Sequence, residues 1–312
     1  MGVWVTGLYS GDFALDLRST IGAIAKLPFE SERLLDILCE SERGAADRAD
    51  DPDHTTFWLV VADQFAKRGI DSKRAQKAAL EIIDSKSDLA AMEKLGMQAP
   101  DLRKREKVLE QLRQSIMAPT ARAKERELIK HPQPLLMQTG DVLVYPTFGG
   151  RCRNPYIVNQ DKDRMGGACL PWQMDGWAAM VIIDSGRAFD FLAWYRPVLL
   201  ARAMAEKPNL ATLQEDQTWK LARAGTSTAS HFKRMGIEKI GALAMDREKL
   251  KTCFGELAPG TSDAVGNISI ANRMSVEPHV PPERIGKAEN LASTRPAKPF
   301  TSIAGLRQIA EW

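Results

Sequence analysis

The chain has 312 residues, of which 27% are charged and 44% hydrophobic, ordinary values for a globular protein of about two domains. Its 43 basic and 40 acidic residues leave a net charge of +3. That balance argues against a dedicated nucleic-acid-binding protein, which would carry a strong basic excess. No apolar run approaches the length of a membrane span, so we expect no membrane partner.

The cysteines indicate a reducing compartment. Cys39, Cys152, Cys169 and Cys253 are scattered and include no Cys-x-x-Cys pair, and the opening has too few apolar residues for a signal peptide. We therefore expect a cytoplasmic protein whose thiols are mostly small buried side chains. If Cys152 and Cys169 flank a hairpin, a disulfide between them or a reactive thiol at this place is an alternative.

The opening of the chain predicts a turn-rich segment followed by a helix. Its glycines supply backbone freedom, and Ser10 or Asp12 can cap the helix. Leu8 and Tyr9 are apolar enough to anchor this segment against the core. The following apolar residues recur at helical spacing, at Phe13, Leu17, Ile21 and Ile24. A phosphate-cradling loop is the functional alternative, but neither Gly-x-x-x-x-Gly-Lys nor Gly-x-Gly-x-x-Gly is present.

Seven positions of this opening follow one pattern: Met1, Gly2, Trp4, Gly7, Asp12, Ala14 and Asp16. The pattern resembles a family of uncharacterised bacterial proteins that begin Met-Gly-x-Trp-Gly-x-Gly. Val5 stands where that family has glycine, and Gly11 where it has asparagine. The match covers about the first tenth of the chain, and it implies no activity.

Residues 1–118 predict a helical domain. Ser31 and Asp53 are candidate helix caps, and Gly69 and Gly96 are candidate helix ends. Pro100 opens a longer helix in its first turn. Residues 119–138 combine basic side chains with a proline-rich stretch, which is typical of a semi-extended linker.

Residues 139–275 carry strand patterns. We expect a strand over Asp141–Pro146 that ends at the proline. A hairpin is predicted from Ala178–Asp184 and Ala188–Tyr195, with its turn at Asp184–Arg187. Further elements are expected as helices at Leu210–Arg223 and Asp246–Phe254 and a strand at Ile240–Met245.

After about Val276 the chain holds many prolines and few apolar residues. Residues 276–312 are therefore expected to form a mostly irregular tail, in which Phe300–Trp312 can dock back. The predicted fold class is α+β: an N-terminal helical bundle followed by a domain with a small, mainly antiparallel β-sheet and flanking helices.

Aromatic side chains are concentrated between residues 145 and 195, which hold nine of the 21 in the chain. They form either a core layer or a surface that presents aromatic and arginine side chains to a protein partner. The candidate partner-binding residues are Trp172, Trp177, Tyr156, Arg151 and Arg153. Because six basic and six acidic residues balance between 141 and 196, a groove for nucleic acid is not expected.

The segment Gly140-Asp141-Val142-Leu143-Val144-Tyr145-Pro146 carries a second resemblance. It is similar to the opening Gly-Asp-Val-Phe-x-x-Pro of a family of bacterial immunity proteins that accompany polymorphic toxins, with Leu143 in place of the usual aromatic residue. The resemblance implies a β-rich domain that binds and neutralises a protein partner.

The sequence offers little for catalysis. None of the four histidines has the His-x-x-x-His spacing of a metal site, so no metal, cofactor or catalytic residue is predicted. The enzyme alternative is a hydrolase or transferase that uses Cys152, or His231 with Ser227 or Ser230, although no Gly-x-Ser-x-Gly elbow is present. A scaffolding or oligomerisation protein is a third alternative. The favoured hypothesis is a non-catalytic, immunity-like protein-binding module.

Overall fold

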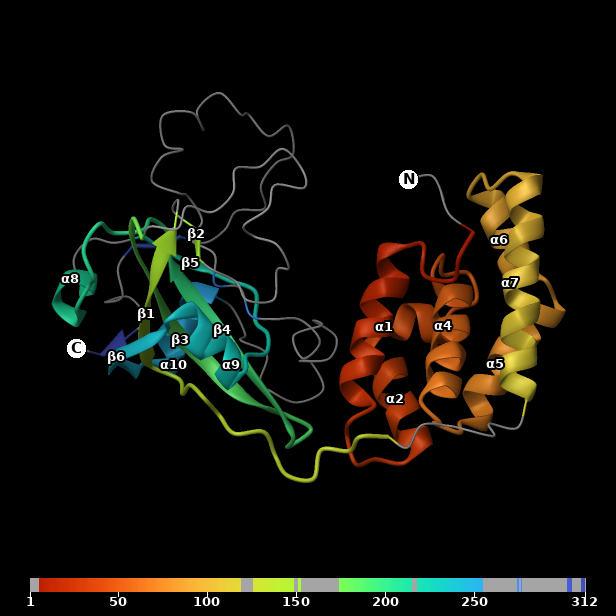
Figure 1. Ribbon diagram of the computed structural model, residues 1–312, viewed down its shortest axis with the longest axis horizontal. Helices are drawn as coiled ribbons and strands as arrows, with labels where there is room; N and C mark the ends of the chain where they lie inside the picture. The colour runs from red at the N-terminus through yellow and green to blue at the C-terminus, as the bar shows by residue number, and fades with distance from the viewer. Residues whose placement is uncertain are drawn as a thin grey trace. The chain divides into compact units, whose positions relative to one another are not determined.

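The structure is a computed structural model that describes residues 6–118, 126–148, 151–152, 174–214, 218–254, 274, 276, 302–304 and 310–311. The chain forms two compact units. The helical unit comprises the described residues up to Pro132 together with Phe189–Phe191, and the sheet unit, which is built on the described strands, comprises the other described residues from Gln133 onward (Figure 1). The predicted α+β class is confirmed.

The helical unit is built around one central helix. Its described helices are α1 (Asp12–Ile24), α2 (Ser31–Ser41), α3 (Arg43–Asp47), α4 (His54–Lys67), α5 (Lys73–Asp84), α6 (Ser87–Lys94) and α7 (Ala99–Met117). Helix α4 packs against α1, α3, α5, α6 and α7 (Figure 1). Its buried positions run without a gap from Phe57 to Phe65, because a helix surrounded by others buries apolar side chains on every face.

Asp53 is the N-cap of α4 as predicted, although its side chain makes no capping bond, and two other helix starts differ from the predicted caps. The N-cap of α1 is Gly11, with no side-chain capping bond, so the prediction for Ser10 or Asp12 was wrong. Ser10 instead donates its hydroxyl to the carbonyl of Gly7 at 2.7 Å. Ser31 lies inside α2 rather than at its cap. Ser72 does cap α5, where its hydroxyl accepts a hydrogen bond from the amide of Ala75 at 3.2 Å.

The sheet unit is organised around one antiparallel sheet. Its strands are β1 (Asp141–Phe148), β2 (Arg151–Cys152), β3 (Gly176–Ala188), β4 (Leu192–Leu200), β5 (Thr218–Leu221), β6 (Glu238–Ala242) and β8 (Ser302–Ala304). The order is β2-β1-β3-β4-β5-β8, and β6 pairs with β1 beside β2. A second sheet pairs β7 (Ala244–Met245) with β9 (Ala310–Glu311).

Both faces of the larger sheet are covered. Alternate side chains of β3, such as Val181 and Met180, enter two different apolar clusters, as the two-residue period of a strand requires. One cluster contains residues of α8 (Leu210–Gln214) and α10 (Arg247–Phe254). The other contains residues of α9 (Ala229–Met235), together with Met137, Met274 and Val276.

The hairpin β3–β4 exists, but its turn lies elsewhere than predicted. Residues 184–187 stay in β3, after a register shift between Ile182 and Asp184. The chain reverses after Ala188, where Phe189 and Asp190 have φ values of 53° and 63°. Gly186 serves packing instead of a turn, because a Cβ there would lie 3.3 Å from the indole nitrogen of Trp194.

Two further expectations were wrong. Strand β1 continues through Pro146 to Phe148, because this proline falls between Val144, the last residue paired with β6, and Thr147, the first paired with β2. The predicted helix Leu210–Arg223 is helical only to Gln214, and Thr218–Leu221 forms strand β5 instead. There Trp219 is fully buried and registers with Leu200 of β4.

Residues of the predicted linker and of the predicted tail make contacts within the two units. Arg126 donates to the carbonyls of Leu27 and Phe29 at 3.1 and 3.0 Å within the helical unit. The side-chain amide oxygen of Gln133 accepts from the amide of Ala193 at 3.0 Å within the sheet unit. From the tail, Ser302–Ala304 and Ala310–Glu311 add strands to the two sheets, and its remaining residues, apart from Val276, lie outside the described part of the chain.

Gly140 ties two parts of the sheet unit together. Its carbonyl accepts from the amide of Leu243 at 2.9 Å, and its amide donates to the carbonyl of Ile182 at 2.7 Å. Its φ is +96°, and a Cβ at this position would lie 2.2 Å from the carbonyl oxygen of Leu243. The position therefore requires glycine both for its backbone angle and for its close backbone contact.

Replacing Gly140 with alanine is expected to destabilise the sheet unit by about 3 kcal/mol or more, because the methyl group meets backbone that cannot move aside. The control is Gly236→Ala, where φ is +64° but the nearest atom is 3.4 Å away, so a cost of about 1 kcal/mol is expected. Urea unfolding followed by tryptophan fluorescence measures both. Equal losses for the two variants would contradict this account.

Candidate functional site

The sequence-predicted binding residues are only partly within the described chain. Trp177 lies in β3, and Arg151 forms β2 with Cys152, although only the backbone of Arg151 is described. Trp172, Tyr156 and Arg153 lie outside the described residues. The structure therefore gives the side-chain surroundings of one candidate, Trp177.

Three other aromatic residues of this region belong to the core. Tyr145, Trp194 and Tyr195 are all buried. The hydroxyl of Tyr145 donates to the carbonyl of Val276 at 2.6 Å, and the hydroxyl of Tyr195 accepts from the amide of Leu136 at 2.9 Å. These three residues therefore belong to the core. The two tyrosine hydroxyls hold the backbone of Val276 and of Leu136 against the sheet. Burial raises the pKa of Tyr195 above its usual value.

Trp177 is half-buried and rigidly held. Its amide donates to the carbonyl of Met204 at 2.7 Å, and its carbonyl accepts from the amide of Met204 at 2.8 Å. The ammonium of Lys207 lies 5.0 Å from the centroid of its indole ring and also pairs with Glu238 at 2.6 Å. Met174, three residues before Trp177, is 51% exposed. We call Trp177 and Lys207, together with Met174 as the neighbour of Trp177 in the chain, the tryptophan patch.

The groups named for the enzyme alternative are enclosed. Cys152 and His231 each have 0% exposure. The Sγ atom of Cys152 lies 3.5 Å from the carbonyl oxygen of Val276, and Nδ1 of His231 lies 3.2 Å from the hydroxyl of Ser227. Ser227 and His231 thus come together as the sequence suggested, but a substrate has no access to the imidazole in this structure. Cys169 lies outside the described residues, so its pairing with Cys152 is not tested.

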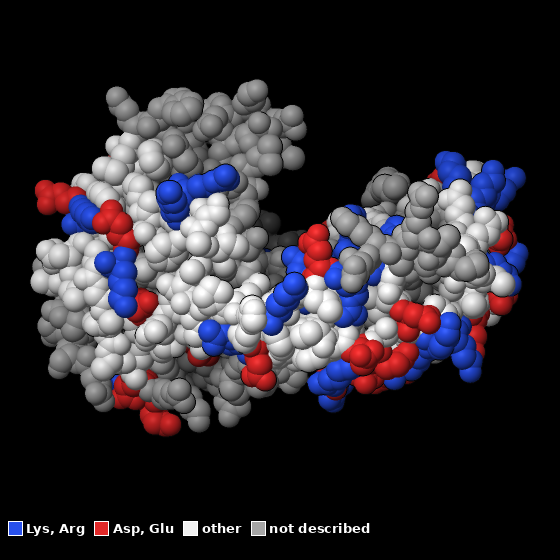
Figure 2. Space-filling view, turned by 60° about the horizontal axis from the view of Figure 1, so that its bottom comes forward, with Lys and Arg blue, Asp and Glu red and all other residues white. Residues whose placement is uncertain are grey.

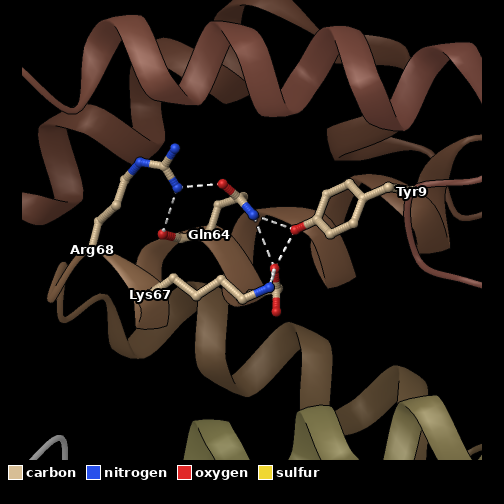
Figure 3. A network of polar contacts seen from close by, with 5 residues as sticks. Tyr9, Gln64, Lys67 and Arg68 are labelled. Atoms are coloured by element: carbon tan, nitrogen blue, oxygen red, sulfur yellow. Dashed lines mark hydrogen bonds and ion pairs between the residues drawn. The ribbon is translucent and has the colours of Figure 1, made fainter.

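Among the described residues, the most connected polar cluster lies in the helical unit, where the sequence predicted no site. Figure 3 shows the hydroxyl of Tyr9 between the side chains of Asp63 and Gln64 on α4. Asp63 also accepts from Lys67 at 2.8 Å, and Gln64 accepts from the guanidinium of Arg68 through its side-chain oxygen. These five residues form one network that links the start of the chain to the end of α4.

Tyr9 is held in its neutral form by this network. Its pKa is raised well above the usual range, first by burial and then by the hydrogen bond to Asp63. Arg18 lies 5.2 Å from the centroid of its ring and Lys67 lies 5.5 Å from it, so the ring also contacts two cations. The expected anchoring of Leu8 and Tyr9 is confirmed, since Leu8 is 7% exposed and Tyr9 is hydrogen-bonded to α4.

A buried ion pair fixes the segment before Tyr9. Arg105 of α7 donates two hydrogen bonds to the carboxylate of Asp88 in α6, at 2.9 and 3.0 Å. The two side chains are 3% and 0% exposed. The remaining terminal nitrogen of Arg105 donates to the carbonyl of Gly7 at 2.8 Å, so this arginine joins α6, α7 and the start of the chain.

Beside the network lies a basic pocket of about 290 Å³. It is lined by residues at the end of α1 and just after it, at the end of α4, and in the segment after α7: Gly22, Ala25, Lys26, Lys67, Arg68, Arg126 and Glu127. Four of these residues are cationic. The i, i+4 spacing of Asp63 with Lys67 and of Gln64 with Arg68 is a sequence signal for part of this arrangement. The contribution of Tyr9, 54 residues before Asp63, has no such signal.

Some kinds of site are not seen in the part of the chain that the structure describes. No three His, Cys, Asp or Glu side chains gather there as metal ligands. No described helix is long and apolar enough to cross a membrane. Comparisons of this chain with models of protein families, with curated proteins and with solved structures find no match.

Breaking the buried pair is expected to be costly. Arg105→Met or Asp88→Leu alone should each destabilise the helical unit by about 3–5 kcal/mol, because the remaining charge is buried without a partner. The double variant should recover most of that loss, since no unpaired charge remains. Chemical unfolding followed by circular dichroism measures all three variants.

The matched control is the exposed pair Arg113–Asp84, whose atoms lie 2.6 Å apart with side chains 37% and 52% exposed. Arg113→Met should cost less than about 1 kcal/mol. If the single variants of the buried pair cost no more than this control, Arg105 and Asp88 do not have the structural role described.

Proposed function

We propose that this chain is a non-catalytic protein-binding protein of the bacterial cytoplasm, and that a protein partner docks on the tryptophan patch. The observation that carries the proposal is Trp177 itself: a half-buried indole on a strand whose backbone is fixed by Met204, with an exposed methionine close by in the chain. A rigid tryptophan costs little entropy when a partner covers it, and tryptophan is enriched among the residues that dominate binding.

The surroundings of the patch suit a protein partner. On the face of the molecule that Figure 2 shows, the described surface of the sheet unit is largely uncharged, with scattered basic and acidic side chains. The Lys207–Glu238 ion pair lies beside the indole and keeps both charges partly exposed. An apolar anchor with a charged rim is the usual composition of a protein interface.

One consideration bears on the class of partner, and another bears on the enzyme alternatives. The resemblance of Gly140–Pro146 to immunity proteins favours a toxin-like protein as the partner. The alternatives that use Cys152 or His231 are less favoured, because neither side chain is exposed. Trp172, Tyr156, Arg151 and Arg153 remain proposed members of the same binding surface, since they precede Trp177 in the chain by at most 26 residues.

The test has two stages. Tagged full-length protein captures a partner from bacterial lysate, and the purified partner is then titrated against Trp177→Ala and against Met174→Glu. We expect about 30-fold weaker binding for Trp177→Ala, equivalent to about 2 kcal/mol, as for a central interface residue. Met174→Glu changes only an exposed side chain, so it reports on the surface even if Trp177→Ala disturbs packing.

Met117→Glu is the matched control, because Met117 is 64% exposed on α7 in the other unit. Unchanged affinity for both patch variants in folded protein, or equal weakening by Met117→Glu, would refute the proposed docking surface. A partner that binds the isolated tag would not count as captured.

A further inference from the structure

We propose that the basic pocket of the helical unit binds the phosphate group of a small molecule. This site is separate from the tryptophan patch, and the proposal does not depend on the proposed protein-binding function. The proposal is supported by the charge of the pocket lining, by the hydrogen bonds that position Arg68 and Arg126, and by the size of the pocket.

The cations of the pocket are poorly neutralised by the described side chains. Lys67 pairs with Asp63, but Lys26, Arg68 and Arg126 form no ion pair with any carboxylate of the described residues. Arg68 and Arg126 donate instead to neutral oxygens, those of Gln64 and of the Leu27 and Phe29 carbonyls. Glu127 is the one acidic side chain among the described lining residues. The lining therefore carries an excess of positive charge.

The guanidinium of Arg68 is positioned through only one of its three nitrogens. Its Nη1 donates to both oxygens of Gln64, and Gln64 is in turn fixed by the hydroxyl of Tyr9. Its Nη2 has no hydrogen-bond partner among the described residues and lies against α1 at Gly22, where a Cβ would be 3.5 Å away. Gly22 and Arg68 both line the pocket.

Placing the guanidinium of Arg68 in this partly buried position has an electrostatic cost. Burial lowers the pKa of Arg68 below its usual value, and the nearby charge of Arg18 acts in the same direction, while Asp63 acts in the opposite direction without restoring the usual value. A bound anion would offset the cost of burial and the repulsion from Arg18.

The chemistry favours phosphate over a carboxylate. Two guanidinium groups and two ammonium groups converge on one pocket, and a phosphate monoester offers up to two charges and several acceptor oxygens to such a set. A volume of about 290 Å³ is near the lower end of ligand pockets, so it suits a phosphate with a small attached group. A pocket of this size is too small for a folded protein partner. The excess positive charge belongs to the described lining of the pocket.

The experiment is calorimetric titration of the full-length protein with inorganic phosphate, glycerol 3-phosphate and acetate at low ionic strength. We expect saturable binding of the two phosphate compounds and at least tenfold weaker binding of acetate. Tighter binding of glycerol 3-phosphate than of phosphate would assign the site to a phosphate ester, and the reverse order would assign it to the free anion.

Two pocket variants locate the site. Lys26→Gln and Arg68→Gln should each weaken phosphate binding about tenfold or more, because each removes one charge from the lining. The side chain of Lys26 makes no hydrogen bond or ion pair with the described residues, so Lys26→Gln is expected to leave the fold intact. Lys104→Gln is the matched control, since Lys104 lies on α7 outside the pocket and is 65% exposed.

Three results would overturn the proposal. The first is no phosphate binding by folded wild-type protein, and the second is acetate binding as tight as phosphate binding. The third is equal weakening by Lys26→Gln and Lys104→Gln, which would mean attraction to the surface charge in general. None of these results bears on the capture experiment, because the tryptophan patch lies in the other unit.

Discussion

The buried ion pair between Arg105 and Asp88 is the contact on which the organisation of the helical unit depends. An arginine in this position must have its charge and its donors satisfied within the protein, and it does so by joining α6, α7 and the carbonyl of Gly7. The start of the chain is thereby fixed, and Tyr9, two residues later, can reach Asp63 and Gln64 on α4.

The same physical rule shapes the sheet unit, where buried polar groups hold irregular segments against a regular scaffold. The hydroxyls of Tyr145 and Tyr195 bind the backbone near Val276 and Leu136, and the backbone of Gly140 binds Leu243 and Ile182. Trp177 is presented by comparable backbone bonds to Met204. Both proposed binding surfaces are therefore built on positions that the fold makes rigid.

Local patterns in the sequence predicted elements better than they predicted turns or long-range contacts. The run of β-branched residues after Ala178 indicated strand β3, but Ser185 and Gly186 were interpreted as a turn although Gly186 makes room for Trp194. The helical periodicity of α1 was clear, whereas Tyr9 and Asp63 are 54 residues apart and no spacing rule joins them. The basic pocket escaped prediction for the same reason, since its cations come from three separate segments.

The central claim, that the Arg105–Asp88 pair positions Tyr9, is tested most directly by the titration of Tyr9. In protein labelled with ¹³C at the tyrosine Cζ, Tyr9→Phe identifies its signal among the four tyrosines. We predict a pKa well above the usual value of about 10, because the folded protein favours the neutral phenol. In the folded double variant Asp88→Leu/Arg105→Met the pKa should move back toward 10. An unchanged pKa of Tyr9 in that variant would contradict the account.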